Sequence, residues 1–410
     1  MRIRKINPNR NSDDLELTPI DLKALVQLRE RLAGFPDRRV QGKVCFPLAD
    51  VLLIAFCALL SDCCHFTEMA LFANTQLTWL GTFMNLPNGA PSHDVFRNVF
   101  MAIKPQYLLE IMAEWAGPLV NKRIMIDGKC LRGTNQGQQG AAAKVYLIRA
   151  WVLESGLSVA QESCADKSGE LVHLPDLLAS LNIEGTTISI DAMGTYPEIA
   201  KIIHEGGGRY VLCLKKNQPQ AYEEVKKHFD QVGGICPETP TAQLSPVPQG
   251  HSRHETVELS HGRYEQRIVT TTDKLAWFTR DWKWHGLKSI TEVRRLSHRN
   301  GAREALSEEV HYYLSSLPAE AEALGQAIRE HWQVENGCHH VLDMTFGEDH
   351  CQVQDANAAQ NLSLLREVAA KVIKAYPTKE SIAAKRKKAC LSPVFRLKVL
   401  LRGFTSLFQA

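Results

Sequence analysis

Residues 123–214 carry the pattern that most constrains the fold. Short apolar segments alternate there with segments of helical periodicity, and turn residues separate them. In chain order the pattern predicts three strands, then helix, strand, helix and strand. The predicted strands cover 123–127, 144–151, 157–163, 187–191 and 210–214, and the predicted helices cover 174–181 and 197–205. We therefore expect a layered α/β sheet in this part of the chain.

Two of the predicted strands end in an aspartate followed by a small residue. They are Arg123–Asp127, followed by Gly128, and Thr187–Asp191, followed by Ala192. The predicted order is that of an RNase H-like sheet, in which the first and fourth strands are central neighbours. We expect the two carboxylates to lie side by side there. The alternative is that each aspartate only caps the turn that follows its strand.

A third acidic candidate, Glu335, lies in the predicted helix 319–342. Three- and four-residue steps place Glu335 on one face of this helix with largely apolar and histidine side chains. That face contains Ile328, His331, Trp332, Glu335, His339 and Leu342. An acid within such a stripe needs a partner, which is either a metal ion or an ordinary basic neighbour.

Three converging acids are what phosphodiester cleavage by two metal ions requires. Mg²⁺ prefers oxygen ligands and binds only a few carboxylates, which leaves room for water and phosphate oxygens. Asp127, Asp191 and Glu335 are therefore candidates for a catalytic site of this kind, which would hold two Mg²⁺ ions, with Mn²⁺ as a substitute.

The remaining segments predict further domains, because 410 residues exceed one small core. Residues 1–118 are expected to form an all-α N-terminal domain, in which Ser92 is the N-cap of a helix reaching Phe100. Residues 119–375 are expected to form the catalytic domain, with a β-rich insertion at about 235–300. Residues 376–410 are predicted to be a basic tail.

Composition bounds the class of protein. A content of 44% hydrophobic and 23% charged residues is ordinary for a globular protein, and no signal peptide or membrane span is evident. We expect a cytoplasmic, nucleoid-associated protein without a membrane partner. The 11 cysteines form no framework, and the cluster Cys338, His339, His340, His350 and Cys351 fits no standard zinc spacing.

Several basic residues are candidates for DNA contact. Residues 370–402 carry net +9, against +3 for the whole chain, and include Lys385, Arg386, Lys387 and Lys388. Lys215, Lys216 and Asn217 follow a predicted strand, and Arg263 and Arg267 alternate along another, so that both face one side. The alternatives are a solvated helix, a solvated turn and an internally paired surface.

Seven ordered motifs carry a resemblance that spans about residues 21–401. They are NGAPSHD (88–94), IDGKCLRG (126–133), IDAMG (190–194), LKKNQ (214–218), HGRYEQR (261–267), HWQVEN (331–336) and LDMTFGED (342–349). The chain resembles the H-repeat-associated family of bacterial insertion-sequence transposases, a branch of the DDE superfamily. The resemblance implies an RNase H-like catalytic domain and assigns the triad to Asp127, Asp191 and Glu335.

Other acids near Glu335 are rival ligands. They are Asp343, Glu348 and Asp349, and Asp343 lies about 80° off the Glu335 face of a helix. We expect Asn336 and Asp343 to support Glu335. The chain departs from the family pattern in three places: Cys338-His339-His340 stands where Leu-His-Trp is expected, Tyr196 where a glutamine is usual and Lys216 where a glycine is usual. Ile328, His331 and Leu342 stand where a related branch has Tyr, Arg and Lys, so the hairpin chemistry of that branch is not carried over.

The resemblance implies a transposase that cuts double-stranded DNA at terminal inverted repeats and joins the freed ends to target DNA. A homo-oligomer on DNA is expected, because the two ends must be paired, and residues 92–100 are the candidate recognition helix. Two alternatives stay open: a catalytically silent DNA-binding protein on a transposase fold, and a two-metal nuclease that does not transpose.

Overall fold

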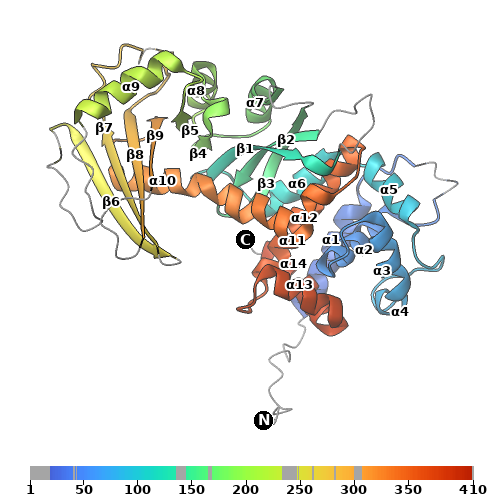
Figure 1. Cartoon of the computed structure of the whole chain (residues 1–410). Helices are drawn as coiled ribbons and strands as arrows, with labels where there is room; N and C mark the ends of the chain where they lie inside the picture. The colour runs from blue at the N-terminus through green and yellow to red at the C-terminus, as the bar shows by residue number, and fades with distance from the viewer. Residues whose placement is uncertain are drawn as a thin grey trace, which may run out of the picture. The chain divides into compact units, whose positions relative to one another are not determined.

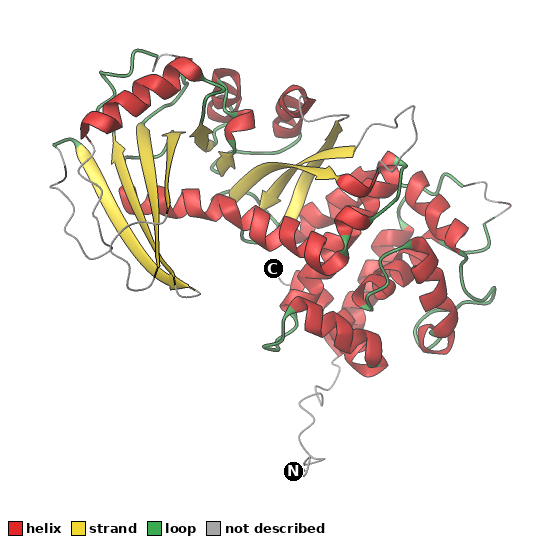
Figure 2. Ribbon diagram, in the orientation of Figure 1, coloured by secondary structure: helices red, strands yellow, loops and turns green. Residues whose placement is uncertain are grey.

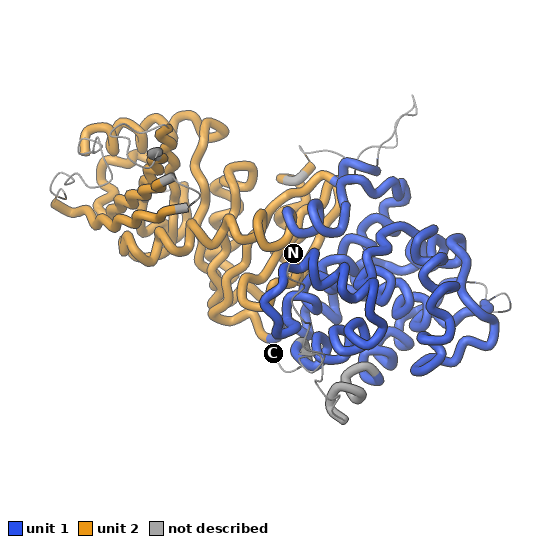
Figure 3. Tube along the Cα trace, turned by 60° about the horizontal axis from the view of Figure 1, so that its bottom comes forward, with its two compact units in different colours: residues 1–117, 131–145, 340–410 blue, residues 118–130, 146–339 orange. Residues whose placement is uncertain are grey.

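The computed structural model describes residues 19–39, 42, 44–134, 145–164, 169–232, 247, 249–260, 263–280, 283–299 and 307–408. The chain divides into two compact units, coloured separately in Figure 3. Unit 1 contains residues 1–117, 131–145 and 340–410, and unit 2 contains residues 118–130 and 146–339. The described residues contain no helix long and apolar enough to cross a membrane.

Unit 2 is built on a nine-stranded sheet with the order β3-β2-β1-β4-β5-β9-β8-β7-β6 (Figure 1). The strands are β1 (Arg123–Leu131), β2 (Val145–Val152), β3 (Leu157–Cys164), β4 (Thr187–Ile190), β5 (Arg209–Leu214), β6 (His251–Ser260), β7 (Arg263–Thr272), β8 (Ser289–Arg299) and β9 (Ser307–Ser315). β1 pairs with β4 in parallel, which confirms that the first and fourth predicted strands are neighbours. The insertion strands β6–β9 extend the same sheet beyond β5.

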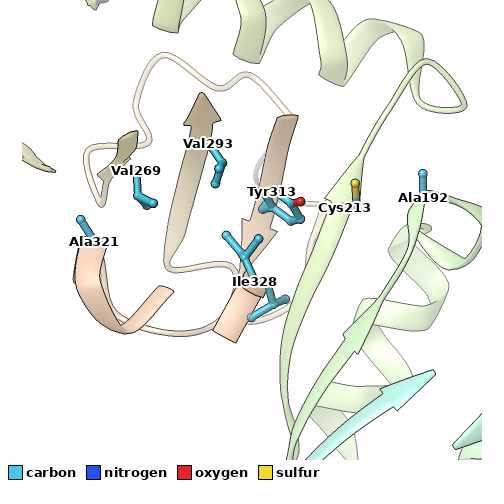
Figure 4. Close-up of a cluster of buried hydrophobic side chains, with 8 residues drawn as sticks. Ala192, Cys213, Val269, Val293, Tyr313, Ala321 and Ile328 are labelled. Carbon is cyan, nitrogen blue, oxygen red and sulfur yellow. The ribbon is translucent and has the colours of Figure 1, made fainter. Parts of the chain in front are cut away.

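Helices cover both faces of this sheet (Figure 2). They are α7 (Glu170–Ala179), α8 (Pro197–Glu205), α9 (Pro219–Val232) and α10 (Ala321–Val334). Successive side chains of a strand point to opposite faces of the sheet, so adjacent residues of β9 contact the helices on opposite sides. Tyr312 meets Phe229 of α9, with ring centroids 6.0 Å apart, whereas Tyr313 joins the buried cluster that contains Ile328 of α10 (Figure 4). That cluster fixes α10 across the sheet.

Several predictions in this unit were wrong in detail. Strand β1 continues to Leu131, four residues beyond the predicted end at Asp127. The strand β6 was missed, since most of its side chains are exposed or half-buried and its sequence lacks apolar alternation. The helix α7 begins at Glu170, four residues before the predicted start.

Unit 1 is helical in the part of it that the structure describes. The α-helices are α1 (Pro19–Ala33), α2 (Leu48–Leu60), α3 (Phe66–Thr75), α4 (Leu77–Leu80), α5 (His93–Ala102), α6 (Pro105–Ala116), α11 (His340–Phe346), α12 (Ala356–Ala375), α13 (Ile382–Leu391) and α14 (Pro393–Phe408). Short 3₁₀ turns occur at η2 (Arg132–Thr134) and η7 (Glu348–His350). The predicted N-cap is confirmed, since Ser92 Oγ accepts from the Val95 N–H.

Both ends of the chain build this helical unit. Helix α12 packs against α2, α5, α6 and α14, and α14 packs against α1. The predicted boundary at residue 375 therefore does not coincide with the end of a unit. Residues 376–408 are two packed helices rather than a tail.

Candidate functional site

Asp127 and Asp191 lie at corresponding positions of neighbouring strands. The parallel register pairs Ile126 with Ile190, so each aspartate follows one residue of a matched pair. Both aspartates line the same small cavity of unit 2. The side chain of Asp127 is 12% exposed, and the Asp191 carboxylate accepts a hydrogen bond of 2.9 Å from the Met193 N–H. Sequence order thus leads to adjacent carboxylates, as expected for the ends of parallel neighbours.

The loop after Asp191 is held tightly. At Gly194, an added Cβ would lie 2.5 Å from Ile190 Cγ2 and 2.8 Å from Leu174 Cδ2, so a side chain would force the strand and α7 apart. Asn217 Nδ2 donates to the Ala192 carbonyl at 2.6 Å. The Asn217 amide, predicted to contact DNA, thus serves to position the loop that carries Asp191.

Glu335 and His339 bring the third element to Asp127. His339 Nδ1 lies 3.3 Å from Asp127 Oδ2 and 3.7 Å from Glu335 Oε2. One ligand atom from each of the three residues lies within 4.8 Å of the others. Among the described residues, this is the group that could hold a metal ion. Asp191 is outside that group but next to Asp127 in the sheet.

The backbone at Glu335 departs from the predicted single helix. Helix α10 ends at Val334, and Glu335–His339 form the π-helical turn η6 before α11 begins. Single π-turns inside helices are rare and occur often at functional sites. Gly337 in this turn lies close to Trp151 of β2, whose ring would be 3.7 Å from an added Cβ. The turn is therefore packed against the strand next to β1.

Burial and charge shift the titration of the site. Burial raises the pKa of Asp191, and the neighbouring charge of Asp127 raises it further. For Asp127 burial also acts to raise the pKa, but the contact with His339 outweighs burial and the pKa is lowered. The His339 pKa is raised, because its contacts with Asp127 and Glu335 outweigh the effect of burial. The pKa values of the two neighbouring aspartates thus shift in opposite directions.

A second histidine, His331 of α10, lies near the three carboxylates. Its Nδ1 is 2.9 Å from Ser189 Oγ of β4. Burial lowers the His331 pKa in spite of the charges of Asp127, Asp191 and Glu335. Sequence reasoning placed His331 and His339 on the Glu335 face but gave neither a role. Their signal was the three- and four-residue spacing around Glu335.

The predicted DNA contacts fall into different environments. Lys215 and Lys216 are exposed after β5, and the side chain of Arg263 lies outside the described residues. Arg267 pairs with Glu265 at 2.5 Å, which is the internally paired arrangement. Arg267 also lines a cavity of about 320 Å³ in unit 2. Its other lining residues include Arg295, His311, Arg329, Trp332 and Asn336.

The basic run of α13 requires a correction. Lys385 and Arg386 are 4% and 2% exposed, so neither is available to DNA. Lys385 Nζ donates to the Tyr376 carbonyl at 2.6 Å, and Arg386 Nε donates to the Leu59 carbonyl at 3.1 Å. Only two of the four cations reach the surface: Lys387, with 71% of its side chain exposed, and Lys388, with 33%.

The rival acids all belong to unit 1. Buried Glu348 is hydrogen-bonded to Ser363 Oγ, and Asp349 lies 3.6 Å from Arg132. The Asp343 carbonyl accepts from the Gly347 N–H, which closes the end of α11. Glu348 and Asp349 thus have local partners in unit 1.

Comparison with known proteins gives two matching family profiles. The profile described as "Transposase DDE domain" matches residues 120–370. The profile of a segment associated with that domain matches residues 29–116. Together they cover α2–α6, nearly all of unit 2 and the part of unit 1 that follows it as far as residue 370.

Individual relatives agree. "H repeat-associated putative transposase YhhI" of Escherichia coli is 32% identical over 85% of this chain and 90% of its own length. "Uncharacterized protein in dhlA 3'region" of Xanthobacter autotrophicus is 36% identical over 65% of this chain and 87% of its own. A piggyBac transposase synaptic complex with hairpin DNA is 11% identical, with a TM-score of 0.41 over 92% of this chain and 81% of that one, too low a score to assign a fold. The chain belongs to the DDE-domain transposases and to their H repeat-associated branch.

Proposed function

We propose that this transposase cuts double-stranded DNA at the terminal inverted repeats of its own element and joins the freed 3′-hydroxyls to target DNA. The observation that carries the proposal is the convergence of acids. Asp127 lies in β1 and Asp191 directly after the parallel neighbour β4, at corresponding positions, and Glu335 faces Asp127 from the π-turn. The strand order β3-β2-β1-β4-β5, with β4 and β5 parallel to β1, supports an RNase H-like core extended by the β6–β9 insertion.

The residues at this site fit divalent metal ions. Carboxylate oxygens are the ligands that Mg²⁺ prefers, and Asp127 Oδ2 is buried without a hydrogen-bond donor in the described part of the chain. Asp127, Asp191 and Glu335 would hold two Mg²⁺ ions, for which Mn²⁺ could substitute. When bound, such ions would activate the attacking oxygen and stabilise the leaving oxygen of the phosphodiester.

The protein itself supplies position and rigidity. Asn217 fixes the loop after Asp191 through the Ala192 carbonyl. Ser189 holds His331 beneath the carboxylates, and the Ile328 cluster fixes α10 on the sheet. A site held by packed elements needs little reorganisation when DNA arrives, and this preorganisation is where such sites gain their rate.

The cavity beside Glu335 offers a route for the DNA strand. It presents three arginines and the 53%-exposed side chain of Trp332, a residue three positions before Glu335. Arginines bind phosphate in a bidentate manner, and an exposed indole can stack on a base. The arginines are paired with glutamates in this structure, so phosphate must replace those partners. In our proposal, the exposed Lys215 and Lys216 add further positive charge along the DNA path.

The test is a cleavage assay on DNA that carries the gene's flanking ends, with Mg²⁺ or Mn²⁺. The wild type is compared with Asp191→Asn and with Asp230→Asn, a control acid on the surface of α9 that pairs with Lys226. We expect 3′-hydroxyls at the element boundary for the wild type and the control, and binding without cutting for Asp191→Asn.

Other outcomes identify the alternatives. If all three proteins bind and none cuts, the chain is a DNA-binding protein on a transposase fold. If the wild type cuts but never joins the ends to a target plasmid, the chain is a nuclease that does not transpose. Either result would overturn the proposal.

A further inference from the structure

The side chain of His339 faces the proposed metal site, and the family resemblance gives this residue no role. Its side chain is 6% exposed, and its Nδ1 is directed at Asp127 Oδ2 and Glu335 Oε2, at 3.3 and 3.7 Å. Its Nε2 is buried without a hydrogen-bond partner in the described part of the chain. Nδ1 is thus the atom through which this ring makes its polar contacts.

The spacing of Asp127 Oδ2 and His339 Nδ1 also fits two ligands that share an ion. The two atoms are at ion-pair distance, and their orientation makes no directed hydrogen bond to Asp127 Oδ2. Ligand atoms about 2.1 Å from one ion and about 90–110° apart lie about 3.0–3.4 Å from each other. The measured spacing of 3.3 Å falls in this range. The longer spacing involves Glu335, whose side chain is 53% exposed and free to adjust.

The π-helical turn η6 brings the Glu335 and His339 side chains to the same site. Glu335 and His339 are the first and last residues of η6, and the turn rests on Trp151 at Gly337. The Lys129 ammonium lies 3.5 Å from the His339 carbonyl, which ties the end of the turn to β1. Glu335 and His339, both in this turn, are thereby directed at Asp127 of β1.

We propose that His339 Nδ1 is a ligand of the metal ion that Asp127 and Glu335 bind. This inference rests on the proposed function. The two metal positions would then differ chemically: Asp127 and Asp191 would offer one ion oxygen ligands only, and the other ion would meet two carboxylates and an imidazole. Imidazole suits first-row transition metals better than Mg²⁺, so the mixed position should bind Mn²⁺, the substitute ion, more tightly than a site with oxygen ligands only.

The experiment is pulsed electron paramagnetic resonance of the full chain loaded with Mn²⁺, without DNA. A coordinated imidazole gives a ¹⁴N coupling, whatever the activity of the protein. We expect this coupling in the wild type and in His340→Asn, a control on the adjacent, exposed histidine. We expect its loss in His339→Asn, with Mn²⁺ affinity lowered about tenfold or more and Mg²⁺ affinity lowered less.

The failures are distinguishable. Mn²⁺ binding without ¹⁴N coupling in the wild type, or coupling that survives His339→Asn and vanishes in His331→Asn, overturns the assignment of His339 and leaves the carboxylate site standing. If the wild type binds no Mn²⁺ at all, the proposed metal site fails with it. Unchanged thermal unfolding of the metal-free His339→Asn protein shows that the loss of coupling is not a loss of fold.

Discussion

Positive charge is used differently in unit 1 and in the insertion strands of unit 2. In unit 1, guanidinium groups lie inside the helical core. Arg386 donates to the carbonyls of Leu59 and Thr345 and stacks 4.0 Å from the Phe346 ring, and Arg396 lies over Trp79. In unit 2, arginines of the insertion strands stay near the surface and pair with glutamates, as Arg295 does with Glu265 at 2.7 Å. A basic sequence run therefore indicates neither a DNA contact nor a solvated face until burial is known.

The largest effect is expected from Arg386→Met. Removing this buried guanidinium takes away the side-chain donor to the carbonyls of Leu59 and Thr345, which should destabilise unit 1 by about 3–5 kcal/mol. Urea unfolding measures the change. The matched control is Lys387→Met on the adjacent exposed residue, expected to stay within about 0.5 kcal/mol. Equal effects of the two variants would remove the distinction between buried and exposed cations.

A pH dependence should follow from a second buried cation of unit 1. Burial raises the pKa of Cys351, but Arg366 and His65 outweigh burial and bring it to about 7, below the usual value of 9.0. The folded state therefore favours the thiolate form of Cys351. The stability of the fold should rise by up to about 2–3 kcal/mol from pH 6 to pH 9, and this gain should be lost as the pH falls through about 7. Unfolding of Cys351→Ser across this range should lack that rise, whereas Cys390→Ser, on an exposed cysteine, should keep it.

Trp332 tests whether the arginine-lined cavity of unit 2 receives DNA. Trp332→Ala should weaken binding of the flanking-end DNA by about 1–3 kcal/mol, because the stacking surface is lost. Trp332→Phe should retain most of the affinity. Titrations at fixed salt, followed by fluorescence anisotropy, measure both. If alanine and phenylalanine bind DNA as tightly as tryptophan, the cavity is not part of the DNA path.

The smallest effect concerns the exposed cations. Lys387→Met should lower the magnitude of the slope of log affinity against log salt by about one, with little change between DNA sequences, if this lysine contacts a phosphate. A slope equal to that of the wild type would place α13 away from the DNA and leave binding to unit 2.

Much of the catalytic sheet could be predicted because local and long-range signals agree there. Largely apolar segments of β1 and β4 each lead to an aspartate and then a small residue, and their topology makes the two strands parallel neighbours. The burial of Lys385 and Arg386 could not be predicted, since a basic helix has the same sequence pattern whether its side chains contact solvent or backbone carbonyls. The π-turn at Glu335 was also out of reach, because the helical periodicity around it continues in the sequence. The role of His339 depends on that turn.

Because helices from both ends of the chain build unit 1, its core cannot close during synthesis until α12 and α14 have left the ribosome. The helices α1–α6 emerge first and must wait, with apolar faces uncovered, while all of unit 2 is translated. A premature stop between residue 340 and the start of α14 at Pro393 then yields a chain that keeps the three proposed catalytic acids but lacks the last helix of the core. Frameshifts near the 3′ end of such a gene should therefore be as damaging as loss of an aspartate, and nascent chains should depend on chaperones until the final helix is made.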